Sequence, residues 1–127
     1  MTAIPPDRPP VVHIGNHELG ELLEEGVPVV DIRTAPEWTQ TGVVKGSHLL
    51  TFFDPLGRHD APGFLEAVRR IAPADQPVIV ICRSGSRTVP VSRFLAEAGR
   101  YPTVYNVRGG ILEWIAAGLP VESPRPG

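Results

Sequence analysis

Short apolar runs alternate with segments of helical periodicity along most of this chain, and the alternation restricts its fold more than any other feature. The apolar runs that predict strands occupy residues 11–14, 27–32, 48–53, 78–81 and 103–107. Strands that alternate with helices favour a mainly parallel sheet covered by helices on both faces. The run at 78–81, Val-Ile-Val-Ile, is wholly apolar, which is typical of a central strand buried on both sides. We therefore expect an α/β domain.

Helices are predicted between these strands from capping residues, helical spacing and stop signals. The first follows Asn16 as its N-cap and ends at Gly26. The second begins with a capping box of Thr34 and Glu37 and ends at Gly42. Three more are predicted over residues 64–71, 86–98 and 110–117, with Pro90 in the first turn of the second of these. Residues 54–63 are rich in Asp, Pro and Gly and predict a surface loop.

The length and composition are typical of one globular domain. The chain has 127 residues, of which 42% are apolar and 20% charged, and its net charge is −2. Proteins that bind nucleic acid through bulk charge are strongly basic, so we expect no nucleic-acid partner. No apolar run approaches the roughly 20 residues of a membrane span, so no membrane partner is expected. Proline-rich tails are predicted at residues 1–10 and 123–127, around a folded domain at 11–122.

The chain contains a single cysteine, Cys82, which excludes an intramolecular disulfide and a Cys-rich zinc cluster. The four histidines are scattered along the sequence, so we expect no metal site. Residues 1–10 lack the apolar segment of a secretory signal peptide. A reduced, cytoplasmic setting is therefore expected.

The sequence around Cys82 predicts an anion-binding loop at an active site. Cys82 directly follows the most apolar strand, and the next residues are Arg83, Ser84, Gly85, Ser86, Arg87 and Thr88, where a helix begins. Working sites of parallel α/β sheets lie beyond the carboxyl ends of the strands. Loop N–H groups and a helix N-terminus attract an anion, and the two arginines add full charges that favour a nucleophilic thiolate. Ser86 and Thr88 are predicted to cap the helix rather than to contact a substrate.

An inert, buried cysteine is the alternative interpretation of Cys82, because free cysteines are often buried in protein cores. The loop composition disfavours this alternative, since arginines and serines are poor residues for filling an apolar core. We therefore expect Cys82 to be the catalytic residue and residues 83–88 to bind the substrate or form the active-site loop.

The segment Val-Ile-Cys82-Arg-Ser-Gly-Ser-Arg87-Thr resembles the active-site loop of the rhodanese family, the thiosulfate sulfurtransferases and their relatives. Two other stretches are similar to this family's N-terminal and C-terminal signatures. They are Val30-Asp31-Ile-Arg33-Thr-Ala-Pro-Glu37-Trp38 and Asn106-Val-Arg-Gly109-Gly110-Ile-Leu-Glu-Trp114. The three signatures occur in the family's order and spacing, and the resemblance covers residues 11–121. It implies a doubly wound, mainly parallel sheet of about five strands with helices on both faces.

The resemblance also implies a chemistry for the site. Cys82 is expected to attack the sulfane sulfur of an anionic donor, such as thiosulfate or a persulfide, and to become a persulfide itself. The terminal sulfur then passes to a thiophilic acceptor, which is cyanide, a thiol or a protein, and no cofactor is required. Arg83 and Arg87 would hold the anionic part of the donor or organise the loop. Related phosphatases and arsenate reductases carry a longer loop, so the six residues from Cys82 to Arg87 favour sulfur transfer.

Four residues outside the loop are candidates for supporting roles. Asp31 and Arg33 end a predicted strand at the edge of the sheet that carries Cys82, and we interpret them as a structural ion pair, with orientation of the loop as the alternative. Glu37 lies near a position that is basic in some thiosulfate-using relatives, which disfavours thiosulfate as the natural donor. Arg108 is open to two interpretations, a residue at the pocket rim or a solvated loop arginine.

A non-catalytic rhodanese-like module that binds a partner or senses oxidants is the alternative function. Many relatives lose the cysteine when they become binding modules, whereas this chain keeps both the cysteine and a complete loop. Sulfur transfer is therefore the preferred hypothesis.

Overall fold

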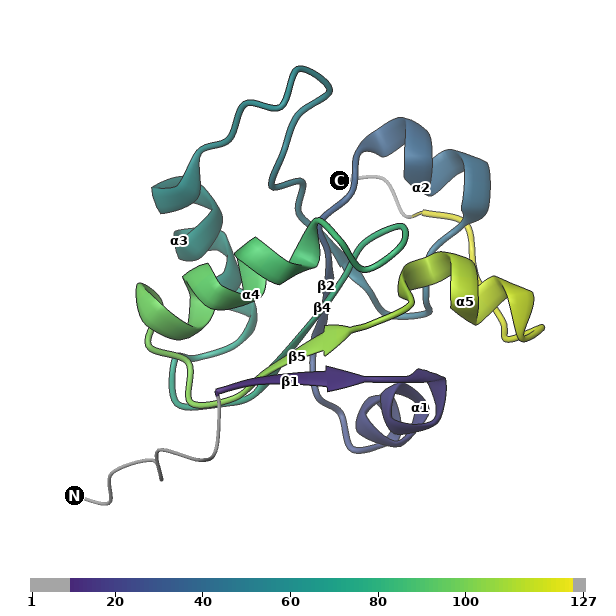
Figure 1. Ribbon diagram of the computed structural model, residues 1–127, viewed down its shortest axis with the longest axis horizontal. Helices are drawn as coiled ribbons and strands as arrows, with labels where there is room; N and C mark the ends of the chain where they lie inside the picture. Colours follow the sequence, from purple (N-terminus) through teal and green to yellow (C-terminus); the bar gives the residue numbers. More distant parts are fainter. Residues whose placement is uncertain (1–9, 125–127) are drawn as a thin grey trace.

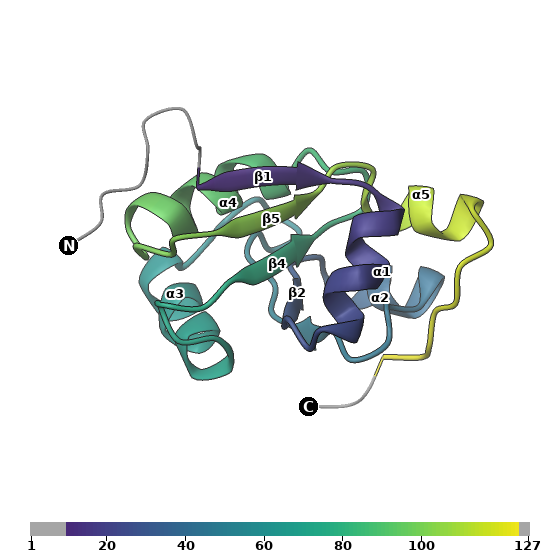
Figure 2. The same cartoon turned by 90° about the horizontal axis from the view of Figure 1, so that it is seen from below.

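A computed structural model of the protein describes residues 10–124, which form a parallel five-stranded sheet with helices on both sides (Figures 1 and 2). The strands are β1 (Val11–Ile14), β2 (Val29–Asp31), β3 (His48–Leu49), β4 (Val78–Ile81) and β5 (Val104–Val107). Their order across the sheet is β1-β5-β4-β2-β3, and every neighbouring pair is parallel. The predicted fold class is confirmed. The tails predicted at residues 1–10 and 123–127 lie outside the described residues, except for residues 10, 123 and 124.

Within residues 10–124, four helices connect these strands and a fifth follows β5. They are α1 (Asn16–Glu24), α2 (Ala35–Thr41), α3 (Ala61–Ile71), α4 (Thr88–Glu97) and α5 (Gly110–Ala116). In Figure 1 the sheet is seen nearly on edge, with α3 and α4 above it and α1 below it. In this part of the chain, none of the helices has the length and apolar character needed to cross a membrane.

The central strand β4 separates two apolar cores. Its four residues are fully buried, and alternate side chains point to opposite faces of the sheet. Val78 and Val80 belong to the core under α3 and α4, whereas Ile79 and Ile81 belong to the core under α1 and α5. Cys82 follows Val78 and Val80 in this alternation, so its side chain lies on the same face of the sheet as α3 and α4.

Some predicted boundaries are wrong in ways that the contacts explain. The strand expected at 48–53 pairs as a strand only at 48–49. Beyond it, the N–H groups of Leu50 and Phe52 donate one hydrogen bond each, to the carbonyls of Asp31 and Ile32, and the Phe52 side chain is buried in the core. The helix expected at 64–71 begins at Ala61, because the Asp60 side chain caps it by accepting from the N–H of Gly63 at 3.1 Å. The first helix has Gly15 as its N-cap, with Asn16 already inside the helix.

Candidate active site

The Cys82 loop, residues 82–87, leaves the carboxyl end of β4 and leads into α4. In Figure 1 it emerges between α2 and α5, beyond the ends of the strands. The Cys82 side chain is fully buried, and its Sγ accepts a hydrogen bond from the N–H of Gly85 at 3.2 Å. The Thr88 hydroxyl lies 3.5 Å from the same sulfur. The loop thus directs one backbone donor and one hydroxyl at a single sulfur atom.

The predicted capping roles of Ser86 and Thr88 are wrong. The N-cap of α4 is Arg87, and no side chain caps this helix. Thr88 is the first residue of α4, so its hydroxyl points back over the loop, where it donates to the carbonyl oxygen of Gly85 at 3.2 Å. The Ser86 hydroxyl lies 3.4 Å from that of Ser84, and both serines are exposed. Of the two hydroxyls, only that of Thr88 reaches Cys82.

The other side of the loop is held by the first turn of α5. The N–H of Ile111 donates to the carbonyl of Cys82 at 2.9 Å, and the N–H of Leu112 donates to that of Arg83 at 3.1 Å. This approach requires Gly110, whose φ is +62° and whose Cβ, if present, would lie 2.7 Å from the Cys82 oxygen. Both carbonyls are therefore held by N–H groups of α5.

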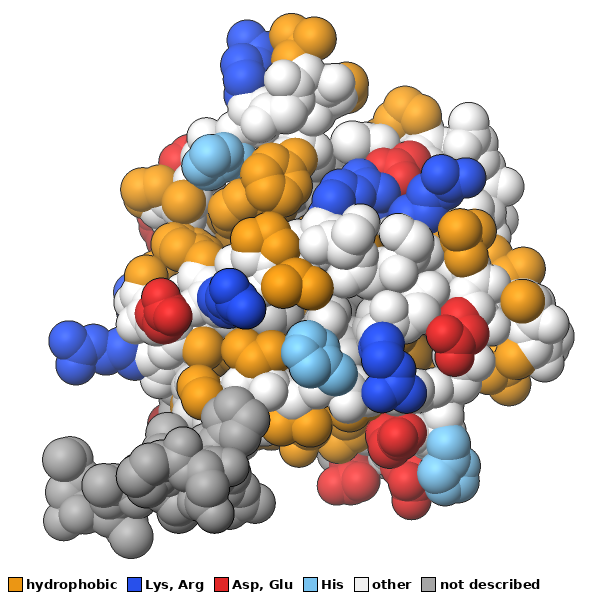
Figure 3. Space-filling model, viewed as in Figure 1, with side chains coloured by type: hydrophobic (Ala, Val, Ile, Leu, Met, Phe, Trp, Pro, Cys, Tyr) orange, Lys and Arg blue, Asp and Glu red, His pale blue; other side chains and the backbone are white. Residues whose placement is uncertain are grey.

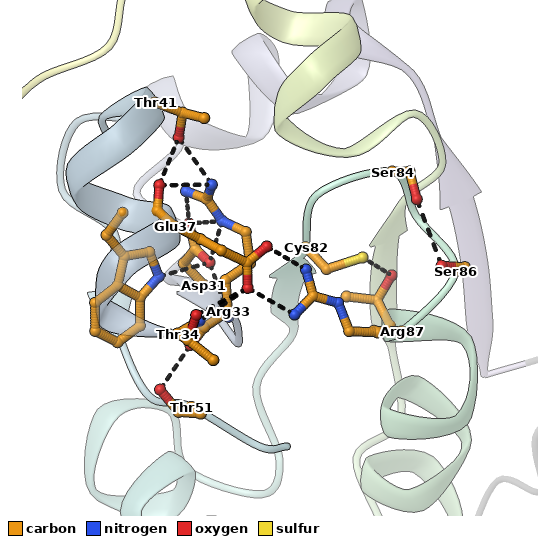
Figure 4. Close-up of polar contacts among 12 residues, drawn as sticks. Asp31, Arg33, Thr34, Glu37, Thr41, Thr51, Cys82, Ser84, Ser86 and Arg87 are labelled. Carbon is orange, nitrogen blue, oxygen red and sulfur yellow. Dashed lines mark hydrogen bonds and ion pairs between the residues drawn. The ribbon is translucent and has the colours of Figure 1, made fainter. Parts of the chain in front are cut away.

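Arg87 makes a bidentate ion pair with Glu37 of α2 (Figure 4). Its two terminal nitrogens donate to the two carboxylate oxygens at 2.8 and 2.6 Å. Glu37 also accepts from the N–H of Thr34 at 3.3 Å, so the predicted capping box is present. Hydrogen bonds to the carboxylate, led by that from Arg87, lower the pKa of Glu37 from 4.5 to about 2 against the opposing effect of burial. The hydrogen bond to Glu37 in turn raises the pKa of Arg87 above its ordinary value.

Asp31 and Arg33 form a fully buried ion pair at the end of β2, with Nη2 and Oδ2 2.8 Å apart. The remaining polar atoms of the pair have partners. Arg33 donates to Thr41 Oγ1 at 2.8 Å and to the carbonyl of Gly42 at 3.1 Å, and the indole N–H of Trp38 donates to Asp31 at 3.0 Å. These contacts join the middle and the C-terminal end of α2 to the end of β2, which holds this helix beside the Cys82 loop.

The remaining candidates lie at the surface. Arg83 is exposed, and Arg108 is an exposed residue whose backbone lies against Gly85. Figure 3 shows basic side chains beside an acidic one over the region of α2 and the loop. In the segment at 52–64, Phe52 stacks on His59 with ring centroids 5.2 Å apart, and Leu56 is 76% exposed. The structure therefore brings Cys82, Gly85 and Thr88 together and leaves Arg83, Ser84 and Ser86 on the outer side of the loop.

Comparison with known proteins identifies the domain. A family model described as a rhodanese-like domain matches residues 15–117 of the chain. The chain belongs to the rhodanese-like family. This confirms the resemblance inferred from the three sequence signatures.

Relatives of this rhodanese-like domain carry sulfurtransferase names. A sulfurtransferase of Allochromatium vinosum is 33% identical over 116 residues, which are 90% of this chain and 97% of that protein. The thiosulfate sulfurtransferase GlpE of Actinobacillus pleuropneumoniae is 34% identical over 111 residues, covering 87% and 92% of the two chains. A crystal structure of an M. tuberculosis protein is similar with a TM-score of 0.71 at 28% identity, covering 88% of this chain and 97% of that one. The two named sulfurtransferases support a sulfurtransferase family for the domain, and the solved structure supports its fold.

Proposed function

We propose that this rhodanese-like domain transfers sulfane sulfur through a persulfide on Cys82. The observation that carries the proposal is the convergence of the Gly85 N–H and the Thr88 hydroxyl on the Cys82 sulfur, at 3.2 and 3.5 Å. Donors aimed at one atom stabilise negative charge there, and a thiolate, a persulfide and the transition state between them all carry such charge. A reduced cytoplasmic setting is part of the proposal, since the lone thiol has to stay free to react.

The reaction has two displacement steps. In the first, the Cys82 thiolate attacks the terminal sulfur of a donor, a new S–S bond forms, and the donor's own bond breaks with its electron pair leaving on sulfite or on a thiolate. In the second, a thiolate or cyanide attacks the outer sulfur of the Cys82 persulfide, and the Cys82 thiolate leaves. No electrons are gained or lost overall, so no cofactor is required.

Phosphate-ester hydrolysis is disfavoured by the position of Arg87. A phosphatase that uses such a loop needs the arginine to bind the oxygens of the phosphate. Here both terminal nitrogens of Arg87 donate to Glu37. A non-catalytic module that binds a partner or senses oxidants is the competing proposal, and the experiment below distinguishes it from sulfur transfer.

The test is the intact mass of the protein after treatment with thiosulfate, and separately with glutathione persulfide, followed by removal of the reagent. We expect the mass of one added sulfur atom with at least one donor, lost again on addition of a thiol and absent in Cys82→Ser. Circular dichroism checks that the variant is folded. No added sulfur with either donor, or sulfur that remains in Cys82→Ser, would overturn the proposal and leave the non-catalytic module.

A further inference from the structure

Three arginines lie around the Cys82 loop: Arg87 is half-buried, and we call it the inner arginine, whereas Arg83 and Arg108 are exposed and form the outer positions. Arg87, the inner arginine, has 29% of its side chain exposed. Both of its terminal nitrogens are taken up by Glu37, whose side chain is 21% exposed. The inner charge is therefore neutralised, and its hydrogen-bond donors point at a carboxylate of the protein itself.

The outer charge lies on two exposed arginines. Arg83 and Arg108 are both exposed, and neither forms an ion pair with the residues described between 10 and 124. Arg83 follows Cys82 directly, and its carbonyl is held by α5 while its side chain faces solvent. The Arg108 guanidinium leans toward the start of α1, 3.4 Å from the point where a Cβ on Gly15 would lie. The Glu18 carboxylate lies 3.5 Å from the same point, so Arg83, next to Cys82 in the sequence, is the outer arginine that no described carboxylate approaches.

Sulfane donors differ in where they carry their negative charge. In thiosulfate the anionic oxygens sit on the atom bonded to the transferable sulfur, and sulfite leaves as a dianion at that point. In the persulfide of a carboxylate-bearing thiol, the carboxylates lie many bonds away and the leaving group is a singly charged thiolate. The first donor needs a free cation beside the cysteine, whereas the second needs cations at a distance from it.

We propose that Glu37 sets the donor specificity of this site by occupying Arg87, so that the domain favours persulfides of carboxylate-bearing thiols or peptides over thiosulfate. Arg83 binds the remote carboxylates at the rim. The proposal rests on the proposed sulfur-transfer function and adds the substrate class. Glu37 acts through Arg87 and is therefore a specificity-determining residue that does not itself touch the reacting sulfur.

The test compares kcat/KM for thiosulfate and for glutathione persulfide, with one common acceptor thiol, in the wild type and in Glu37→Gln. Gln keeps an oxygen that can accept from Thr34 at the start of α2 but removes the charge that holds Arg87. We expect kcat/KM for thiosulfate to rise by about tenfold, mainly through a lower KM, because a guanidinium becomes available to the oxyanion. The value for glutathione persulfide should change by less than about twofold, since its carboxylates lie at the rim.

The reciprocal variant is Arg83→Ala. It should raise KM for glutathione persulfide by about tenfold and leave thiosulfate much less affected, because only the first donor reaches the rim. Glu66→Gln is the matched control, since it removes the same charge from an exposed ion pair with Arg70 on α3 and should leave the ratio between donors unchanged. Thr34→Ala removes the hydroxyl that donates to Glu37 at 3.0 Å but keeps the carboxylate and its charge, so it tests whether a weakened start of α2 alters that ratio, and we expect no change.

The outcomes separate this proposal from the one on which it rests. Absence of Cys82-dependent transfer with both donors overturns the proposed function. Transfer with both donors, but with thiosulfate preferred by the wild type or with an unchanged ratio in Glu37→Gln, overturns the donor specificity alone. A ratio that changes equally in Thr34→Ala would show that α2 stability, and not the charge of Glu37, controls the site.

Discussion

The Thr88 hydroxyl lies between the Cys82 sulfur, 3.5 Å away, and the carbonyl oxygen of Gly85, 3.2 Å away. A hydroxyl donates only one hydrogen bond at a time. With a neutral thiol, the bond to the carbonyl satisfies the hydroxyl and leaves its oxygen free to accept from the S–H. With a negatively charged sulfur, rotation of the hydroxyl supplies a donor to the charge. Thr88 can therefore serve both states without movement of the backbone.

A prediction follows for Thr88→Val, which keeps the shape of the side chain and removes the hydroxyl. We expect the second-order rate of Cys82 alkylation by iodoacetamide at neutral pH to fall by about tenfold, because a hydrogen bond to a charged group is worth about 1.5–3 kcal/mol. Thr88→Ser is the control and should stay near the wild-type rate. An unchanged rate in Thr88→Val would mean that the Gly85 N–H alone stabilises the thiolate.

At the scale of single residues, the sequence predicted only some of the side chains that meet around Cys82. The cysteine and the six-residue loop follow from local order along the chain. The pairing of Glu37 with Arg87 does not, because the two are 50 positions apart and the capping box already explains a glutamate at that place. The adjacency of β2 and β4 is needed to bring α2 against the loop.

At the scale of elements, the first turn of α5 acts as a clamp on the Cys82 loop. Two of its N–H groups, which have no partner within the helix, bond to the Cys82 and Arg83 carbonyls. The loop conformation therefore depends on a helix that follows it by more than twenty residues. Gly110 allows the contact because any larger residue there would place Cβ against the Arg83 carbonyl.

Gly110→Ala should therefore lower the free energy of unfolding by about 2 kcal/mol or more and reduce sulfur transfer, since both backbone strain and a collision with the loop are introduced. Gly118→Ala is the matched control, because Gly118 also has a positive φ, +74°, but no atom lies within 4 Å of its added Cβ. It should cost about 1 kcal/mol and leave transfer intact. Urea unfolding and the persulfide assay measure the two effects, and equal loss of transfer in both variants would contradict the clamp.

The sequence predicted the type and order of the elements well because each has a local signal. The apolar run of β4 and the capping box of α2 are examples. It failed at boundaries that tertiary contacts decide, such as the end of β3 at the sheet edge. The earlier start of α3 had a readable local signal in Asp60 followed by Pro62, a residue type favoured in the first turn of a helix.

At the scale of the whole molecule, the ion pair between Glu37 and Arg87 joins α2 to α4 across the mouth of the site. The pKa of Glu37 is about 2 in the folded protein, against an ordinary value of 4.5. Because folding lowers this pKa, the pair stabilises the protein fully above about pH 5 and loses its contribution as the pH falls toward 2.

We therefore expect Glu37→Gln to reduce the free energy of unfolding at pH 7 by about 2 kcal/mol. This is less than the energy that corresponds to the whole pKa shift, because both side chains are partly exposed to solvent. The difference between variant and wild type should shrink steadily between pH 5 and pH 2, where the wild-type carboxyl becomes neutral as well. Urea titrations at several pH values measure it. A difference that is constant with pH would contradict the assignment.

The order β1-β5-β4-β2-β3 places the first strand beside the last one. During synthesis on the ribosome, β1 has no strand to pair with until Val104–Val107 has left the exit tunnel. The Cys82 carbonyl likewise lacks its hydrogen-bond donor until Ile111 has been made. The nascent chain therefore cannot form the whole sheet, or the contacts between α5 and the Cys82 loop, before these later residues are available. Pairing between residues so far apart in the sequence also slows folding. The contacts around Cys82 are therefore complete only after residues 104–112 have been translated, and shorter translation products lack the site proposed for sulfur transfer.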